Sequence, residues 1–149
     1  MLGRFEGESA SDYYGDFRQN DDAFESLELR LMSRLTENIM NAVDYNRVKK
    51  AREENFAMLD SLLGDKNKLK PRLPAGPYAY PFYCENGMAI KKALAAKKIF
   101  VPTLWPEVTE MGQELEADLA KSILPLPCDQ RYGKEDMERI AEELCALLG

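Results

Sequence analysis

The chain has 149 residues, of which 45% are hydrophobic and 31% are charged, and its formal net charge is −6. These values are those of an ordinary globular chain. No apolar run approaches the roughly 18 residues that span a bilayer, and the first residues lack the apolar core of a secretory signal, so we expect a cytoplasmic protein without a membrane partner. An acidic chain repels the phosphate backbone, which argues against a nucleic-acid partner.

The chain contains no histidine and three widely spaced cysteines. The missing histidine removes the commonest metal ligand and the commonest general base. A zinc site, a Ser–His–Asp triad and a Cys–His dyad are therefore not expected, and an odd number of cysteines does not form a disulfide framework. From the residues alone we expect no catalytic and no metal-binding group in this chain.

The first part of the chain carries two helical patterns after an irregular arm over residues 1–20. All eight prolines fall between Pro71 and Pro127, so residues 1–70 lack the residue that most disrupts helices. Over residues 21–43 apolar side chains recur at three- and four-residue steps, which predicts one long helix. A second helix is predicted after Asp44, with Gly64 at its end. Residues 21–64 would form a helical segment that connects to a large domain. The apolar positions of the first helix are Phe24, Leu27, Leu31, Leu35, Ile39 and Val43.

From residue 65 onward the pattern alternates between short apolar runs and helical spacings. A loop rich in Lys, Pro and Gly at 65–76 precedes it. The predicted fold class is α+β, or loosely α/β: two N-terminal helices, then a small three-stranded sheet covered by helices, with 65–149 as the small domain. The predicted strands are Tyr78–Cys84, Ile99–Val101 and Ile123–Leu126, and the predicted helices contain Ile90 and Leu94, then Met111, Leu115 and Leu119, then Met137 to Leu148.

Four stretches in this order resemble the small C-terminal domain of the DegT/DnrJ/EryC1 group of fold-type-I pyridoxal-phosphate aminotransferases. They are AREENFAMLDSLLG (51–64), YAYPFYCENG (78–87), KKIFVPTLWP (97–106) and ILPLPCDQRYGKEDMERI (123–140). In that family a large doubly wound domain precedes this region. It supplies the lysine that forms the Schiff base, the acidic partner of the pyridinium nitrogen and most phosphate contacts.

Such covalent chemistry needs an amine nucleophile, an electron sink and an anchored phosphate. This chain has no lysine in the family's Ser/Thr-x-x-Lys setting and no Gly-rich loop that opens a helix. The resemblance therefore implies pyridoxal phosphate as a cofactor of a complete enzyme, with this chain inactive alone and no cofactor-binding residue in it. We expect a fragment, namely a shortened gene product or a piece cut at the domain boundary. The alternative is a separate subunit that completes its enzyme in trans.

The resemblance also places substrate-binding candidates on two loops. The loop Pro102–Glu107 would face the substrate through Thr103 and Trp105. Sugar-modifying members often carry a histidine there, and its absence puts a nucleotide-sugar substrate in doubt. The alternative for Trp105 is a core position between sheet and helix, since large aromatic side chains are mostly buried.

Arg131 is the third candidate, because an arginine of the small domain commonly grips a substrate carboxylate through its bidentate fork. Its alternative is a structural pair with Asp129 or with acids of the terminal helix. Arg52 is predicted to lie on the solvent side of its helix. The expected partner is the missing large domain or a separate chain. A non-catalytic interaction module that self-associates through exposed apolar helix faces is the second hypothesis.

Overall fold

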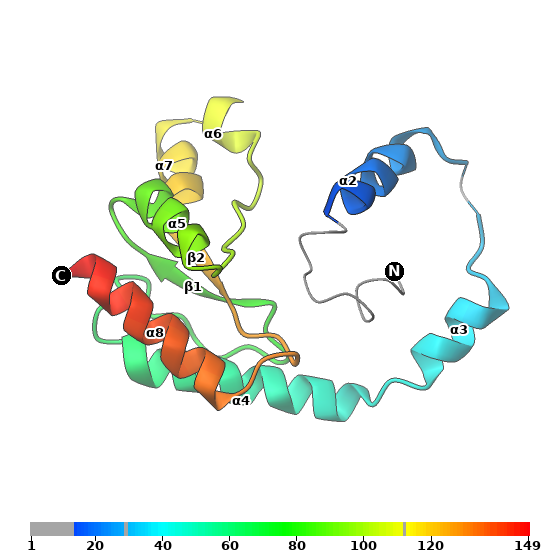
Figure 1. Cartoon of the computed structure of the whole chain (residues 1–149), viewed down its shortest axis with the longest axis horizontal. Helices are drawn as coiled ribbons and strands as arrows, with labels where there is room; N and C mark the ends of the chain where they lie inside the picture. The colour runs from blue at the N-terminus through cyan, green and yellow to red at the C-terminus, as the bar shows by residue number, and fades with distance from the viewer. Residues whose placement is uncertain (1–13, 29, 112) are drawn as a thin grey trace. The chain divides into compact units, whose positions relative to one another are not determined.

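The computed structural model describes residues 14–28, 30–111 and 113–149. By contacts between Cα atoms, the chain divides into two compact units, residues 1–43 and residues 44–149. Figure 1 shows the elements of each unit. All the buried side chains of the described residues belong to the second unit, between Asn55 and Leu144. The second unit therefore carries the hydrophobic core.

The first unit contains helix α2 (Tyr14–Ala23), a 3₁₀ turn η2 (Phe24–Ser26) and helix α3 (Arg34–Asn41). The prediction of one helix over 21–43 is wrong, because Leu27 is extended and a new helix starts only after Ser33. The Ser33 hydroxyl accepts the Thr36 N–H at 3.1 Å, an N-cap that favours a restart there. A helix gains most of its stability from burying an apolar face, and no residue of α3 is buried.

The irregular arm predicted over residues 1–20 lies in part outside the described residues, which begin at residue 14. Residues 14–20 belong to α2, so this part of the prediction is wrong. Asp16 in the first turn of α2 favours the positive end of the helix dipole. A solvated helix needs no apolar period, which is why the sequence pattern did not reveal it.

The second unit begins with helix α4 (Tyr45–Leu63), which matches the predicted helix between Asp44 and Gly64. The Asp44 carboxylate accepts the Arg47 N–H at 3.0 Å and caps its start. Helix α8 (Lys134–Leu148) lies beside α4 (Figure 1). The expected division placed α4 with the N-terminal helical segment, whereas in the structure α4 packs on α8 and on the sheet.

In the described part of the chain the sheet has two antiparallel strands, β1 (Ala79–Tyr83) and β2 (Ile123–Pro127). Between them come α5 (Gly87–Ala96), α6 (Val108–Met111) and α7 (Glu114–Ser122). The predicted helix through Met111, Leu115 and Leu119 is thus divided between α6 and α7. The sheet and the helices α4, α5 and α8 enclose one core. Its largest fully buried apolar side chains are Phe56, Leu59, Leu63, Tyr80, Phe82, Leu94, Leu124, Leu126, Met137 and Leu144.

The predicted third strand at Ile99–Val101 is wrong. Lys98 has a positive φ of 62°, and the Ile99 N–H bonds the Leu94 carbonyl at 2.9 Å, which closes the end of α5. Strand β2 also has few outward N–H groups that a third strand could bind. In an antiparallel pair alternate N–H groups face outward, and two of these positions on β2 are Pro125 and Pro127, which have no N–H.

The outer edge of β1 is covered by one side chain, Asn67, which is 1% exposed. Its amide oxygen accepts the Tyr83 N–H at 3.2 Å, and its amide nitrogen donates to the Pro81 carbonyl at 2.9 Å and to the Tyr80 hydroxyl at 3.2 Å. The Tyr80 hydroxyl in turn donates to Asp60 on α4 at 3.0 Å. One amide therefore replaces a neighbouring strand and joins β1 to α4.

Candidate functional site

The loop that follows β2 holds Arg131 against Asp129. The Arg131 guanidinium donates from Nε to Asp129 Oδ1 at 2.7 Å and from Nη2 to Oδ2 at 2.8 Å. This fork lowers the pKa of the Asp129 carboxyl, an effect that burial partly opposes. The guanidinium carbon also lies 5.6 Å from the Tyr132 ring centre. Substrate binding by Arg131 would require an incoming carboxylate to share or displace Asp129.

Two side chains of α4 fix this loop, a role that the sequence pattern did not predict. The buried Asn55 amide donates to the carbonyls of Asp129 and Tyr132 at 3.1 and 3.0 Å. Arg52 donates to the Gln130 side chain at 2.8 Å and to the Pro77 carbonyl at 3.0 Å. The prediction that Arg52 faces solvent is therefore incomplete, because its guanidinium also binds these two groups. A polar Asn one position before the apolar Phe56 was the available signal, but its partners lie more than 70 residues away.

The loop Pro102–Glu107 exposes Trp105, whose side chain is 72% exposed and whose φ is 50°. The alternative in which Trp105 fills the core is therefore wrong. Thr103 is half-buried, and its hydroxyl accepts from the Lys91 ammonium at 3.3 Å. The same ammonium contacts the Ala120 carbonyl at 3.5 Å, in the last turn of α7. Lys91 therefore links the loop to the helix that leads into β2.

The three predicted site residues do not form one cluster within this unit. Thr103 and Ala120 lie near each other because both accept from the Lys91 ammonium. Ala120 comes three residues before Ile123, the first residue of β2. Arg131 follows the last residue of β2 by four positions, and Arg52 and Gln130 link its loop to the start of β1. A five-residue strand is about 17 Å long. Thr103 and Arg131 thus lie near opposite ends of β2, so together they would contact an extended ligand rather than a small one.

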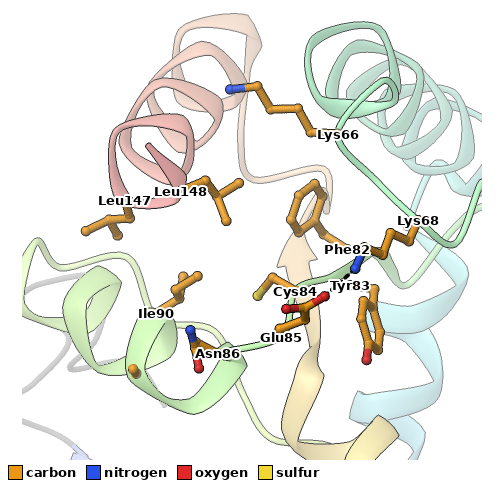
Figure 2. A pocket seen from close by; sticks show the side chains of 11 residues that line it. Lys66, Lys68, Phe82, Tyr83, Cys84, Glu85, Asn86, Ile90, Leu147 and Leu148 are labelled. Atoms are coloured by element: carbon orange, nitrogen blue, oxygen red, sulfur yellow. Dashed lines mark hydrogen bonds and ion pairs between the residues drawn. The ribbon is translucent and has the colours of Figure 1, made fainter.

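A separate open hollow of about 520 Å³ lies where α5, α8 and the end of β1 meet (Figure 2). Its apolar wall includes Phe82, Ile90 and Leu148, and its rim carries charged groups. Across this rim Lys68 pairs with Glu85, and the hydrogen bond between them raises the pKa of Lys68 and lowers that of Glu85. The hollow is polar at its rim and open to solvent, and the two charges neutralise each other.

Lys68, Lys91 and the start of α5 do not fit pyridoxal phosphate. A Schiff base needs a lysine that reaches an enclosed cavity, and a phosphate needs free N–H groups at a helix start. Lys68 is exposed and engaged by Glu85, whereas Lys91 is buried and bonded to Thr103. At the start of α5 a Cβ on Gly87 would lie 2.2 Å from the Lys121 carbonyl oxygen, so packing against the chain fills that space.

The described part of the chain shows neither a cluster of metal ligands nor a helix that could span a membrane. No group of three or more His, Cys, Asp or Glu side chains there is arranged to hold a metal ion. Among the described helices, none combines the length and the apolar character that crossing a bilayer requires.

The comparisons with known proteins give one fold relationship. No protein-family model matches the chain, and no curated protein matches it. A solved structure that matches is the crystal structure of a DegT DnrJ EryC1 StrS aminotransferase from Brucella abortus, with a TM-score of 0.56 and 20% sequence identity. The match covers 68% of this chain and 31% of that chain. At this identity the likeness shows a shared α+β fold, and the matched part spans about a third of the aminotransferase chain.

Proposed function

We propose that this chain is the C-terminal small domain of a DegT/DnrJ/EryC1-type aminotransferase, and that it acts only together with a pyridoxal-phosphate-binding large domain. The observation that carries the proposal is the fold shared with part of the Brucella abortus enzyme. The four sequence stretches described above, in the family's order, support it independently. Fold alone does not imply activity, so the assignment depends on both.

In a complete enzyme this domain would close the substrate cleft over an amino-group transfer between an amino acid and a keto substrate. Small domains and lids commonly exclude water and complete a binding site in this way. The exposed Trp105 ring offers an amphipathic surface for an incoming substrate. Arg131 would recognise a carboxylate by exchanging its fork with Asp129. Because these side chains lie towards opposite ends of β2, we expect an elongated substrate or two separate contacts.

Borohydride reduction in the presence of pyridoxal phosphate tests the inactivity of the isolated chain. A true Schiff-base lysine is trapped stoichiometrically at one position, whereas exposed lysines react weakly and at random. We expect only scattered labelling, found by peptide mass spectrometry, with Lys92 and Lys134 as typical exposed sites. Stoichiometric labelling of a single lysine, Lys91 included, would contradict the proposal.

The reading frame immediately upstream tests the assignment itself. If the proposal is correct, that frame encodes a doubly wound domain with a Schiff-base lysine, either continuous with this chain or adjacent to it. Co-expression of the two should yield a complex with an aldimine absorption band. An upstream sequence unrelated to such a domain would contradict the assignment.

A second candidate function is self-association through α3, and one observation favours it. The apolar side chains Leu35 and Ile39 are 70% and 59% exposed on this amphipathic helix. Sedimentation velocity of the wild type and of the Leu35→Asp/Ile39→Asp variant would detect it. The Asn38→Asp/Asn41→Asp variant adds the same charge to the polar side of α3 and serves as the control. A wild-type monomer at all concentrations would exclude this function.

A further inference from the structure

The segment before Trp105, residues 100–104, has few attachments to the rest of the domain. Phe100 and Trp105 are exposed, and Pro102 has no N–H to donate. Within the described residues, the bond from Lys91 Nζ to Thr103 Oγ1 is the one recorded hydrogen bond that joins residues 100–104 to another element. The side chains of Ile99 and Val101 pack on the core at the start of the loop. After this segment the Trp105 and Pro106 carbonyls accept the Val108 and Thr109 N–H groups at 3.0 and 3.1 Å. The position of residues 102–104 therefore depends on the contact at Thr103.

Lys91 is an unusual residue for the place it occupies. Its side chain leaves the middle of α5, and the residue is only 7% exposed. Both of its recorded acceptors, the Thr103 hydroxyl and the Ala120 carbonyl, are neutral. Among the described residues no carboxylate lies within the 4.0 Å of an ion pair with it. Burying an ammonium group without a counter-charge is costly, so stability of the fold does not explain a lysine here.

The location of the two acceptors explains why a lysine is buried at this position. Ala120 is in the last turn of α7, where carbonyl groups lack partners within the helix and the helix dipole is negative. Thr103 lies in the middle of the loop, two residues before Trp105. One ammonium group thus bridges the end of α7 and the loop.

We propose that Lys91 is a positioning residue: through Thr103 and Ala120 it holds the first part of the Pro102–Glu107 loop against α7 and, together with the bonds of Trp105 and Pro106 to α6, fixes the place of the Trp105 ring. The substrate consequence rests on the function proposed above, in which Trp105 lines the substrate mouth. The positioning itself depends only on the contacts within this unit. Left-handed backbone at Lys98 and Trp105 turns the chain on either side of Thr103, so loss of this contact frees the segment that leads into Trp105.

The experiment uses Trp105 as the reporter, because it is the only tryptophan of the chain. Thr103→Val keeps the shape of the side chain and removes the acceptor, while Thr103→Ser keeps the hydroxyl. Lys91→Met removes the donor, and Lys92→Met changes an exposed lysine next to it. Tryptophan anisotropy decay and hydrogen exchange of the peptide covering residues 99–107 are measured for each full-length variant, and circular dichroism checks folding.

We expect Thr103→Val and Lys91→Met each to speed hydrogen exchange in this peptide about fivefold, the effect of losing one modest hydrogen bond. Both should also shorten the slow anisotropy decay of Trp105. Thr103→Ser and Lys92→Met should match the wild type, and the double variant should equal Lys91→Met, which already removes the contacts with both Thr103 and Ala120.

If Lys91→Met unfolds the chain, the Thr103 pair still decides the question. Wild-type exchange and anisotropy in Thr103→Val would overturn the proposal, as would equal effects of Thr103→Val and Thr103→Ser. These results are independent of any aminotransferase activity. Failure to find a large-domain partner would remove the proposed function and leave the positioning result unchanged.

Discussion

At the scale of single residues, the burial of Lys91 makes the stability of the fold depend on pH. Burial lowers the pKa of its ammonium group below the ordinary value of 10.5. The unfolded chain, with its ordinary pKa, binds more protons than the folded one in the pH range between these two values. Folding stability contributed by this group therefore rises as pH increases towards 10.5, and its cost is fully present below the folded pKa.

Lys91→Met should remove this pH dependence. We expect the difference in free energy of unfolding between Lys91→Met and the wild type to shift in favour of the wild type as pH rises towards 10.5. Urea denaturation at a series of pH values measures it. The raised pKa values of Tyr80 and Cys128 give an opposite slope, but it is the same in both proteins and cancels in the difference. The raised pKa of Cys84 is partly lowered by Lys91 and would not cancel, so both proteins carry Cys84→Ala. A difference that does not change with pH would contradict the lowered pKa.

The cysteines provide a second prediction at this scale. Burial raises the pKa of Cys128 to about 11 and also raises that of Cys84, so both remain thiols at neutral pH. Cys145 is half-buried. In the native protein we expect iodoacetamide to modify Cys145 at least about tenfold faster than Cys128, as followed by peptide mass spectrometry, since alkylation needs an accessible thiolate. Equal rates in the native state would show that the core around Cys128 opens readily, and full labelling in urea is the control.

At the scale of elements, Asn67 replaces a strand at the edge of β1. Asn67→Ala removes two donor and two acceptor bonds. It leaves the Tyr83 and Leu69 N–H groups and the Pro81 carbonyl without this partner. We expect a loss of about 3 kcal/mol in the free energy of unfolding, because each buried group left unpaired costs about 1–3 kcal/mol. Asn86→Ala is the matched control. Asn86 is exposed and its side chain makes no capping bond, so its replacement should change stability by less than about 0.5 kcal/mol.

The elements also show where sequence patterns succeed and fail. Helices α4 and α8 and strands β1 and β2 were predicted because their apolar spacing matches the core that they share. The helix over 21–43 has the same spacing but no core within its unit, and the chain leaves the helical conformation at Leu27. The run Ile99–Val101 is apolar enough for a strand, yet its first N–H closes α5. Apolar periodicity indicates that a segment could bury one side of a helix or strand. The segment keeps that conformation only where another element packs on that side.

At the scale of the whole molecule, all recorded buried side chains lie within residues 55–144. A fragment of residues 44–149 should therefore fold alone, with a cooperative urea transition whose midpoint matches that of the full chain. Circular dichroism would show a loss of helical signal limited to α2 and α3. A broad transition in the fragment, without a cooperative midpoint, would show that the first unit contributes to the core.

The sequence by itself determined the absence of histidine chemistry, the α+β class and the ends of α4, because these follow from composition, local spacing and capping residues. It also identified Thr103, Trp105 and Arg131 as candidates, although their roles remain predictions. Only the tertiary structure decided that Trp105 is exposed, that Arg131 pairs with Asp129, and that Lys91 reaches Thr103 and Ala120 from another element. The physical reason is distance along the chain: a spacing rule describes neighbours within about one or two turns, whereas Lys91 and Ala120 are brought together only when the helices pack on one core.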